Sequence, residues 1–342
     1  MNISKKYILR LSPLVVGILI LLFYSNREGA VDQVPNKVSP ATAPQKVDRL
    51  EEVQAEVRYA EQISALEYRF KAPPGRVIEY GFDIRQNVTL NFPKNPMNPS
   101  QGDVEPQHMN LRFKGTLVSA AYASDTPDRL LLGYEVKDID AETGQEMTQE
   151  LKKQLSDALK HEVLAYVSPR GRFEALYFPA EMPSQIRNLA REIILRAQII
   201  LPESPVNEWD SLEEDATGLF EAKYTARTGD LDGQTILEVS RRIDSYVAIN
   251  SLGSGISKDI PTEPSGSTTA IVMLGDGWLR DLNSSEELKA GGGSFLARIE
   301  KKTDAGLFFR EIRQDSEREK ITAKEMMQRL SGLERASPIG LE

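Results

Sequence analysis

The sequence offers few residues for acid–base or nucleophilic chemistry. It contains two histidines, His108 in a stretch rich in Pro and Asn and His161 at the end of an amphipathic segment, and no cysteine. A Ser-His-Asp triad would need a recognisable nucleophile motif to pair with one of these histidines, and none is present. Without cysteine there can be no disulfide, thiolate metal site or thiol catalysis. We therefore expect no catalytic residue.

One group of acidic residues has a spacing close to that of a calcium loop. Asp138, Asp140 and Glu142 alternate, but Gly144 stands at the seventh place and Gln149 at the twelfth. An EF-hand needs glycine at the sixth place and a bidentate glutamate at the twelfth. We interpret these residues as a solvated loop that joins a strand to a helix.

Two further segments could hold a ligand by composition. Glu213, Glu214 and Asp215 form an acidic cluster, which we interpret as a solvated turn before a strand, with a cation site as the alternative. Residues 253–258 superficially suggest a phosphate loop, but the glycine spacing is wrong and no strong helix follows. The sequence therefore predicts no metal, no cofactor and no catalytic site.

Composition is that of a globular protein. Of 342 residues, 40% are hydrophobic and 27% are charged, enough for one large β domain or two smaller ones. The net charge of −9 argues against nucleic acid as a partner, because phosphate neutralisation needs a surplus of Lys and Arg.

The N-terminus has the pattern of a signal anchor (residues 1–30). Lys5, Lys6 and Arg10 precede a run without charge, residues 11–24, so the remainder is expected outside the cytoplasm. Residues 7–24 would span roughly 27 Å at about 1.5 Å per residue, which just crosses a bilayer. No small-residue cleavage site follows, and a cleaved signal peptide is the alternative. We expect a bacterial inner-membrane protein whose C-terminal domain lies in the periplasm.

A linker and a helix follow the anchor. Residues 31–46 contain Pro35, Pro40 and Pro44 without apolar periodicity, which predicts a stiff spacer. Residues 47–66 have apolar positions at three- and four-residue steps, and we expect a stalk helix within residues 47–72. That helix would dock on its own domain, or pair two chains as a short coiled coil.

The pattern then changes to period two, which predicts a β domain over residues 73–315. Residues 78–92 place their apolar side chains on even positions, as in a long half-buried strand. Residues 93–107 and 251–266 have the composition of loops, and 316–342 of a C-terminal helix and tail. Further strands are expected at 110–123, 129–139, 163–168, 172–178, 219–227, 234–249, 268–274, 278–282, 294–301 and 307–313, helices at 146–161, 183–201 and 322–330, and turns at 169–171, 228–230, 275–277 and 303–306.

An ordered set of features within residues 163–246 is more specific. It runs from Tyr166 through the turn 169–171 and the apolar helix 186–201 to Trp209, and on through the segment from Glu213 to Tyr224. This set resembles the N-terminal β-domain (N-sheet) of vitellogenin and the large lipid transfer proteins. The resemblance extends loosely over 76–313. It implies an α+β, mostly β fold in which a strongly curved antiparallel sheet, or a barrel-like sheet, wraps a central helix.

The chain departs from that family in two respects. The family usually has cysteine where Phe220 stands. It also continues into a helical superhelix and further sheets that build the lipid cavity, whereas this chain ends soon after its last predicted strand. The resemblance therefore implies the fold more than it implies lipid carriage.

We expect a non-enzymatic, membrane-tethered extracytoplasmic binding or scaffold module that docks a partner protein. The partner could be a helical-repeat protein that replaces the missing domains, and the two predicted loops are the expected contact surfaces. The alternative is a lipid-binding or lipid-transfer protein that holds a hydrophobic ligand between the curved sheet and the helix 183–201. An envelope hydrolase is a third hypothesis, against which the missing motifs argue.

Overall fold

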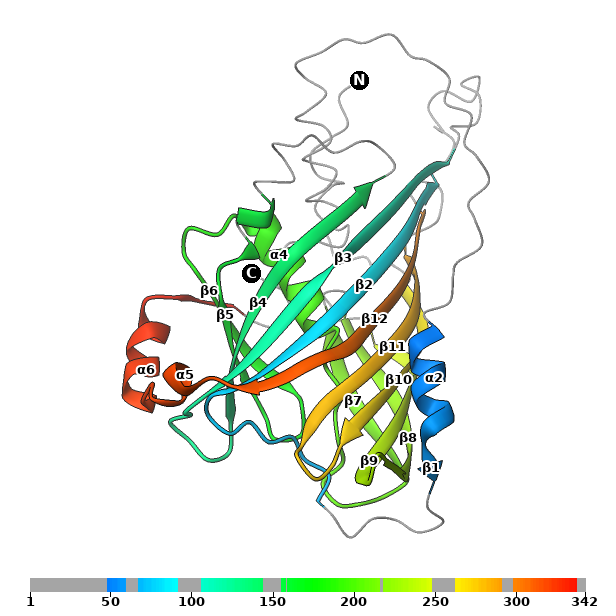
Figure 1. The fold of residues 1–342 in the computed structure, drawn as a ribbon. Coiled ribbons are helices and arrows are strands. Elements are labelled where there is room, and N and C mark those ends of the chain that lie inside the picture. Colours follow the sequence, from blue (N-terminus) through cyan, green and yellow to red (C-terminus); the bar gives the residue numbers. More distant parts are fainter. Residues whose placement is uncertain are drawn as a thin grey trace, which may run out of the picture.

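The computed structural model describes residues 48–59, 67–91, 106–143, 155–157, 159–215, 218–247, 262–290 and 298–336. Within these ranges the chain forms one large antiparallel sheet with a few helices (Figure 1). Its strands follow the order β1-β8-β9-β10-β11-β12-β2-β3-β4-β5-β6-β13, and β7 also pairs with β8. The strands are β1 (Arg58–Tyr59), β2 (Arg76–Asn91), β3 (Gln107–Tyr122), β4 (Leu130–Thr143), β5 (Val163–Val167), β6 (Phe173–Phe178), β7 (Glu208–Asp215), β8 (Gly218–Leu231), β9 (Gln234–Val247), β10 (Thr262–Met273), β11 (Trp278–Ala290), β12 (Arg298–Gln314) and β13 (Glu334–Ala336).

The sheet curls but does not close. One end of the strand order is β7 and β1, side by side on β8, and the other end is β13 on β6. No strand pair among the described residues joins these two ends. The antiparallel sheet that the sequence predicts is confirmed, and the barrel-like form is wrong. Side-chain contacts bridge part of the opening instead, because Arg172 donates from Nη2 to the Leu212 carbonyl at 3.0 Å.

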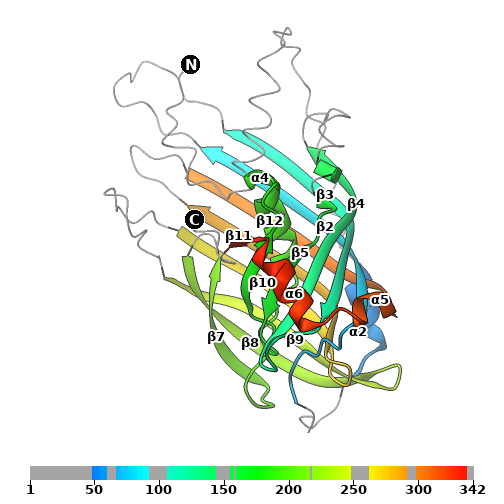
Figure 2. The same cartoon turned by 90° about the vertical axis from the view of Figure 1, so that its left-hand side faces the viewer.

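The long apolar helix lies in the core, on the inner side of the curve (Figure 2). This helix, α4 (Ser184–Leu195), is shorter than the predicted 183–201, with Pro183 as its N-cap residue. Ile193 and Ile194 are 0% and 1% exposed. Alternate residues of β2, beginning with Ile78, belong to the same apolar cluster, so the period-two pattern marked the inner face of the sheet.

Short helices cover parts of the outer side. Helix α6 (Ala323–Ser331) begins with the capping box of Thr322 and Glu325, and packs Met326 and Leu330 over the outer face of β2 to β5. Helix α5 (Ser316–Glu319) precedes it. The predicted helix 322–330 is therefore confirmed, while α5 and β13 were not expected from the sequence.

The structure shows a helix over only the first part of the predicted stalk. Helix α2 (Asp48–Glu56) ends before Arg58 and Tyr59, which pair with β8. Residues 60–66 lie outside the described residues, and residues 67–72 form neither helix nor strand. Leu50 and Val53 are buried in the main core, which agrees with docking of this segment on its own domain. Residues 1–47, with the predicted anchor and linker, lie outside the described residues. No described helix is long and apolar enough to cross a membrane.

Three strands continue through residues that look like turns. Strand β12 includes the expected turn 303–306, because β2 and β11 pair with it on both sides there. Strand β8 includes 228–230, and its real turn is Asp232-Gly233, where Gly233 has φ +77°. Strand β10 begins at Thr262, inside the predicted loop 251–266. The turns at 169–171 and 275–277 are confirmed.

Candidate functional site

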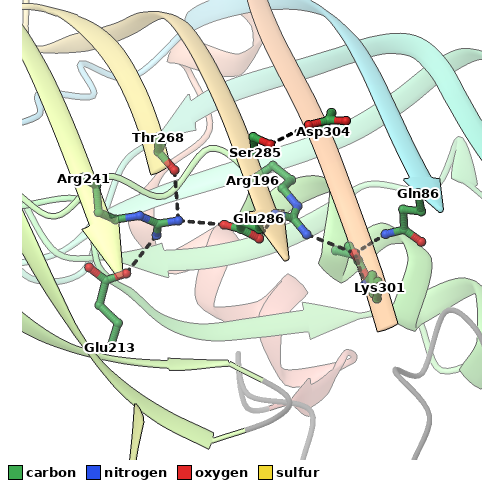
Figure 3. A network of polar contacts seen from close by, with 10 residues as sticks. Gln86, Arg196, Glu213, Arg241, Thr268, Ser285, Glu286, Lys301 and Asp304 are labelled. Carbon is green, nitrogen blue, oxygen red and sulfur yellow. Dashed lines mark hydrogen bonds and ion pairs between the residues drawn. The ribbon is translucent and has the colours of Figure 1, made fainter. Parts of the chain in front are cut away.

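A chain of buried and half-buried charges ties α4 to the inner face of the sheet (Figure 3). Arg196, the C-cap residue of α4, lies between two carboxylates. It forms an ion pair with Glu286 of β11, and its Nη2 lies 3.2 Å from Oε1 of Glu192, one helical turn earlier. On its other side, Glu286 accepts from Nη2 of Arg241 on β9 at 2.8 Å. The helix is thus joined to two strands by charge-assisted hydrogen bonds.

The network extends at both ends. Arg241 Nη1 lies 3.0 Å from Glu213 Oε2 of β7, and the Tyr224 hydroxyl donates to the same carboxylate. At the other end, Lys301 Nζ of β12 and Gln86 Nε2 of β2 lie 3.1 Å and 2.6 Å from Glu192 Oε1. Arg196, Arg241 and Lys301 balance Glu192, Glu213 and Glu286, so the network carries no net charge.

The ion pairs outweigh the cost of burial. Burial raises the pKa of the Glu286 carboxyl, but Arg196 and Arg241 hold it at about 2. Burial likewise opposes ionisation of Glu192, yet Lys301 and Arg196 lower its pKa. The pKa values of Arg196 and Arg241 are raised despite burial by the carboxylates beside them. These four groups are therefore charged at neutral pH, and they position the helix.

The network corrects the interpretation of the acidic cluster 213–215. Glu213 is 1% exposed and lies on β7, whereas the sequence predicted a solvated turn. A period-two signal was present, because Trp209, Ser211 and Glu213 share the inner face. Trp209 stacks on Tyr224, with ring centroids 5.0 Å apart. The run of three acidic residues led to the prediction of a solvated turn in place of this strand.

The other candidate residues lie apart. Asp138, Asp140 and Glu142 lie on β4, so the expected strand-to-helix loop is wrong there; Asp138 sits at a bulge with φ +50°. Glu142 lies 3.8 Å from Lys114 of β3. His108 Nδ1 is 3.1 Å from the Thr89 hydroxyl on the surface, and His161 is exposed. The described residues contain no group of three or more His, Asp or Glu that could hold a metal. Residues 253–258 lie outside them.

A second feature is an apolar cavity at the end of the sheet where β2 begins. Residues 67–72, here called the strap, have no regular secondary structure and cross this end of the sheet (Figure 1). The Phe70 amide donates to the Pro169 carbonyl at 2.6 Å and the Lys71 amide to the Gly277 carbonyl at 2.7 Å. The strap therefore joins the β5–β6 turn to the β10–β11 turn.

The cavity under the strap has a volume of about 80 Å³. Its lining is mainly apolar and aromatic, with two cations, Lys71 and Arg76, also among the lining residues. The lining consists of Phe70, Lys71, Ala72, Arg76, Ile78, Tyr80, Ser119, Ala121, Leu130, Leu132, Tyr134, Val167, Gly171, Phe173, Ala197, Gly277, Trp278 and Leu279. None of these was singled out as a site residue from the sequence, because six separate segments contribute them.

The comparison with solved structures finds a similarity to lipovitellin. A solved structure of that protein, described as showing lipid–protein interactions, matches 72% of this chain with 14% identity and a TM-score of 0.46. The match covers 26% of the lipovitellin chain, so this chain spans about a quarter of it. No family model matches the chain, and no curated protein sequence matches it.

Proposed function

We propose that this chain is a non-enzymatic binding module that is tethered to a membrane through residues 7–24 and docks a partner protein outside the cytoplasm. The observation that carries the proposal is the occupied inner face of the sheet. Helix α4 packs on it, with Ile193 and Ile194 buried and with Glu192 and Arg196 held by strands. A partner then has to bind at the outside or at the open ends of the sheet.

The cost of emptying this space supports the proposal. Exposing one buried Ile side chain costs about 1.5–3 kcal/mol, and α4 buries several apolar side chains besides Ile193. Withdrawing the helix would also separate Arg196 from Glu286 and leave buried charges without partners. Displacement of α4 by a ligand would therefore cost an amount comparable to the whole stability of a typical domain, about 5–15 kcal/mol.

The N-terminal sequence supports the proposed location. Lys5, Lys6 and Arg10 lie before the apolar run, and we propose a bacterial inner-membrane anchor with the β domain in the periplasm. Protease added to spheroplasts should degrade the domain while cytoplasmic controls survive. A mature N-terminus beyond Tyr24 would contradict the anchor.

The docking role is tested by purification of the full-length protein from membranes. A stoichiometric protein partner should co-purify, and a helical-repeat protein is the expected class. Organic extraction of the same sample, followed by mass spectrometry, should find no stoichiometric lipid. Absence of a partner under mild extraction and cross-linking would refute the docking role.

The apolar cavity favours a second candidate, a lipid-binding or lipid-transfer protein. Ala197, just beyond α4, lines the cavity together with residues of the sheet, so a hydrophobic ligand could enter between them. About one lipid per chain in the extract would establish this alternative in place of protein docking.

A further inference from the structure

We propose that the cavity under the strap binds the C-terminal residue of a partner polypeptide, with an aliphatic side chain inside the cavity and the terminal carboxylate at Lys71 and Arg76. This inference rests on the proposed docking function and names the chemistry of the partner.

The enclosed part of the cavity has the size of a single side chain. A cavity of about 150 Å³ in another protein binds benzene, which has six carbon atoms. The present cavity of about 80 Å³ has room for a smaller group. The four carbons of a Leu side chain fit this scale, whereas a lipid acyl chain is several times longer. The surrounding Ile78, Leu132 and Phe173 provide an apolar environment for such a group.

The two cations in the lining favour a ligand with an anionic group. Lys71 Nζ donates to the Gly275 carbonyl at 2.8 Å, and Arg76 Nη1 donates to the Asp276 carbonyl at 2.7 Å. These are backbone acceptors, and no described carboxylate forms an ion pair with Lys71 or Arg76. A carboxylate would therefore add charge-assisted hydrogen bonds at this position. The exposed side chain of Asp276 acts on Arg76 from nearby and would weaken the attraction of an anion.

An unpaired donor lies in the same lining. Trp278 is 8% exposed, and its indole N–H is buried without a hydrogen-bond partner among the described residues. A buried donor without an acceptor costs roughly 1–3 kcal/mol.

The backbone around the cavity is preformed. Gly277 has φ +64°, and a Cβ at this position would lie 2.7 Å from the Lys71 amide nitrogen. Gly171, at φ +89°, is equally crowded by Phe70 and by the Ile199 carbonyl. Glycine at both turns lets the strap pack closely against them. The entrance of the cavity is therefore formed before a ligand binds, and less conformational entropy is lost on binding.

The test uses Trp278 as the reporter. The chain contains two tryptophans, and Trp209→Phe leaves Trp278 alone while an aromatic ring can still stack on Tyr224. The full-length protein in detergent is titrated with a peptide that ends in Leu with a free carboxylate. We expect a saturable change of tryptophan emission, and roughly tenfold weaker binding of the same peptide with an amidated C-terminus, equivalent to about 1.4 kcal/mol.

Matched variants locate the site. Lys71→Gln should weaken the binding of the free-acid peptide severalfold, and Asp276→Asn should strengthen this binding. Lys320→Gln, a change of an exposed lysine on the outer side, should have no effect. Ala197→Leu should fill the cavity and abolish binding without loss of thermal stability. If that variant fails to fold, Ala121→Val is the second filling variant.

The outcomes separate this inference from the docking function. Equal binding of acid and amide peptides, no effect of Lys71→Gln, or tighter binding of laurate than of the peptide would overturn the inference. If a stoichiometric partner still co-purifies with Lys71→Gln and Ala197→Leu variants, docking stands and occurs elsewhere. If no partner co-purifies with the wild-type chain either, the docking function itself fails.

Discussion

Arg241→Met should destabilise the protein far more than the same change at its neighbour Arg242. Arg241 is 11% exposed and holds Glu213 at 3.0 Å and Glu286 at 2.8 Å. Arg242 follows it on β9 and points to the opposite face, where it is 70% exposed and lies 3.2 Å from Asp244. The two variants remove the same charge and the same side chain from adjacent positions, so they differ only in environment.

The size of the difference follows from burial. Without Arg241, Glu213 at 1% exposure keeps the Tyr224 hydroxyl as a partner but loses its cation. Removing one partner of a buried ion pair costs about 3–5 kcal/mol. An exposed pair such as Arg242–Asp244 contributes only about 0.2–1 kcal/mol. We therefore expect the two variants to differ by roughly 2–5 kcal/mol.

Equilibrium urea unfolding of the full-length protein in detergent measures the difference. Both variants should unfold with the same slope m as the wild type, so that the shift of the midpoint reports stability alone. If Arg241→Met loses no more unfolding free energy than Arg242→Met, the charge network does not stabilise the inner face of the sheet. The double variant Glu213→Gln/Arg241→Met should recover part of the loss, since it leaves no unpaired charge at that end.

Three further predictions concern the core, the turns and acid stability. Ile193→Asp should abolish accumulation of folded protein, because an unpaired buried carboxylate costs several kcal/mol; a normally stable variant would contradict the placement of α4. Gly171→Ala should lower the melting temperature more than Gly233→Ala, since both glycines have positive φ but only a Cβ at 171 meets an atom, the Ile199 carbonyl at 2.1 Å; equal losses would refute the packing argument. The pKa of Glu286 is lowered from 4.5 to about 2 in the folded state, so its stabilisation is complete above pH 4.5 and is lost as the pH falls towards 2, which unfolding experiments across that interval should show. Stability that is constant over that interval would contradict the ion pairs of Glu286.

The sequence alone determined most of the local structure of the β domain. The even-numbered apolar positions that begin at Ile78 identified β2 and its inner face, and Gly171 and Gly277 marked turns that the structure contains. The apolar stripe on α4 indicated a helix enclosed by a sheet. These signals are local, because period, turn residues and capping depend on neighbours in the chain. The resemblance to vitellogenin rested on the order of such signals.

Only the tertiary structure decided how charged and polar segments are used. Residues 303–306 have the composition of a turn, but hydrogen bonds from β2 and β11 make them strand. Gly229 looked like a turn glycine, and instead a Cβ there would lie 2.6 Å from Val57, which packs over it. Glu213 belongs to an acidic run by sequence, and Arg241, 28 positions later, makes it a buried partner. The lining of the strap cavity likewise comes from segments far apart in the chain. The type of a residue determines its chemistry. Whether its side chain is solvated or buried depends on the residues that it contacts across the sheet, and these cannot be identified from the neighbouring residues in the sequence.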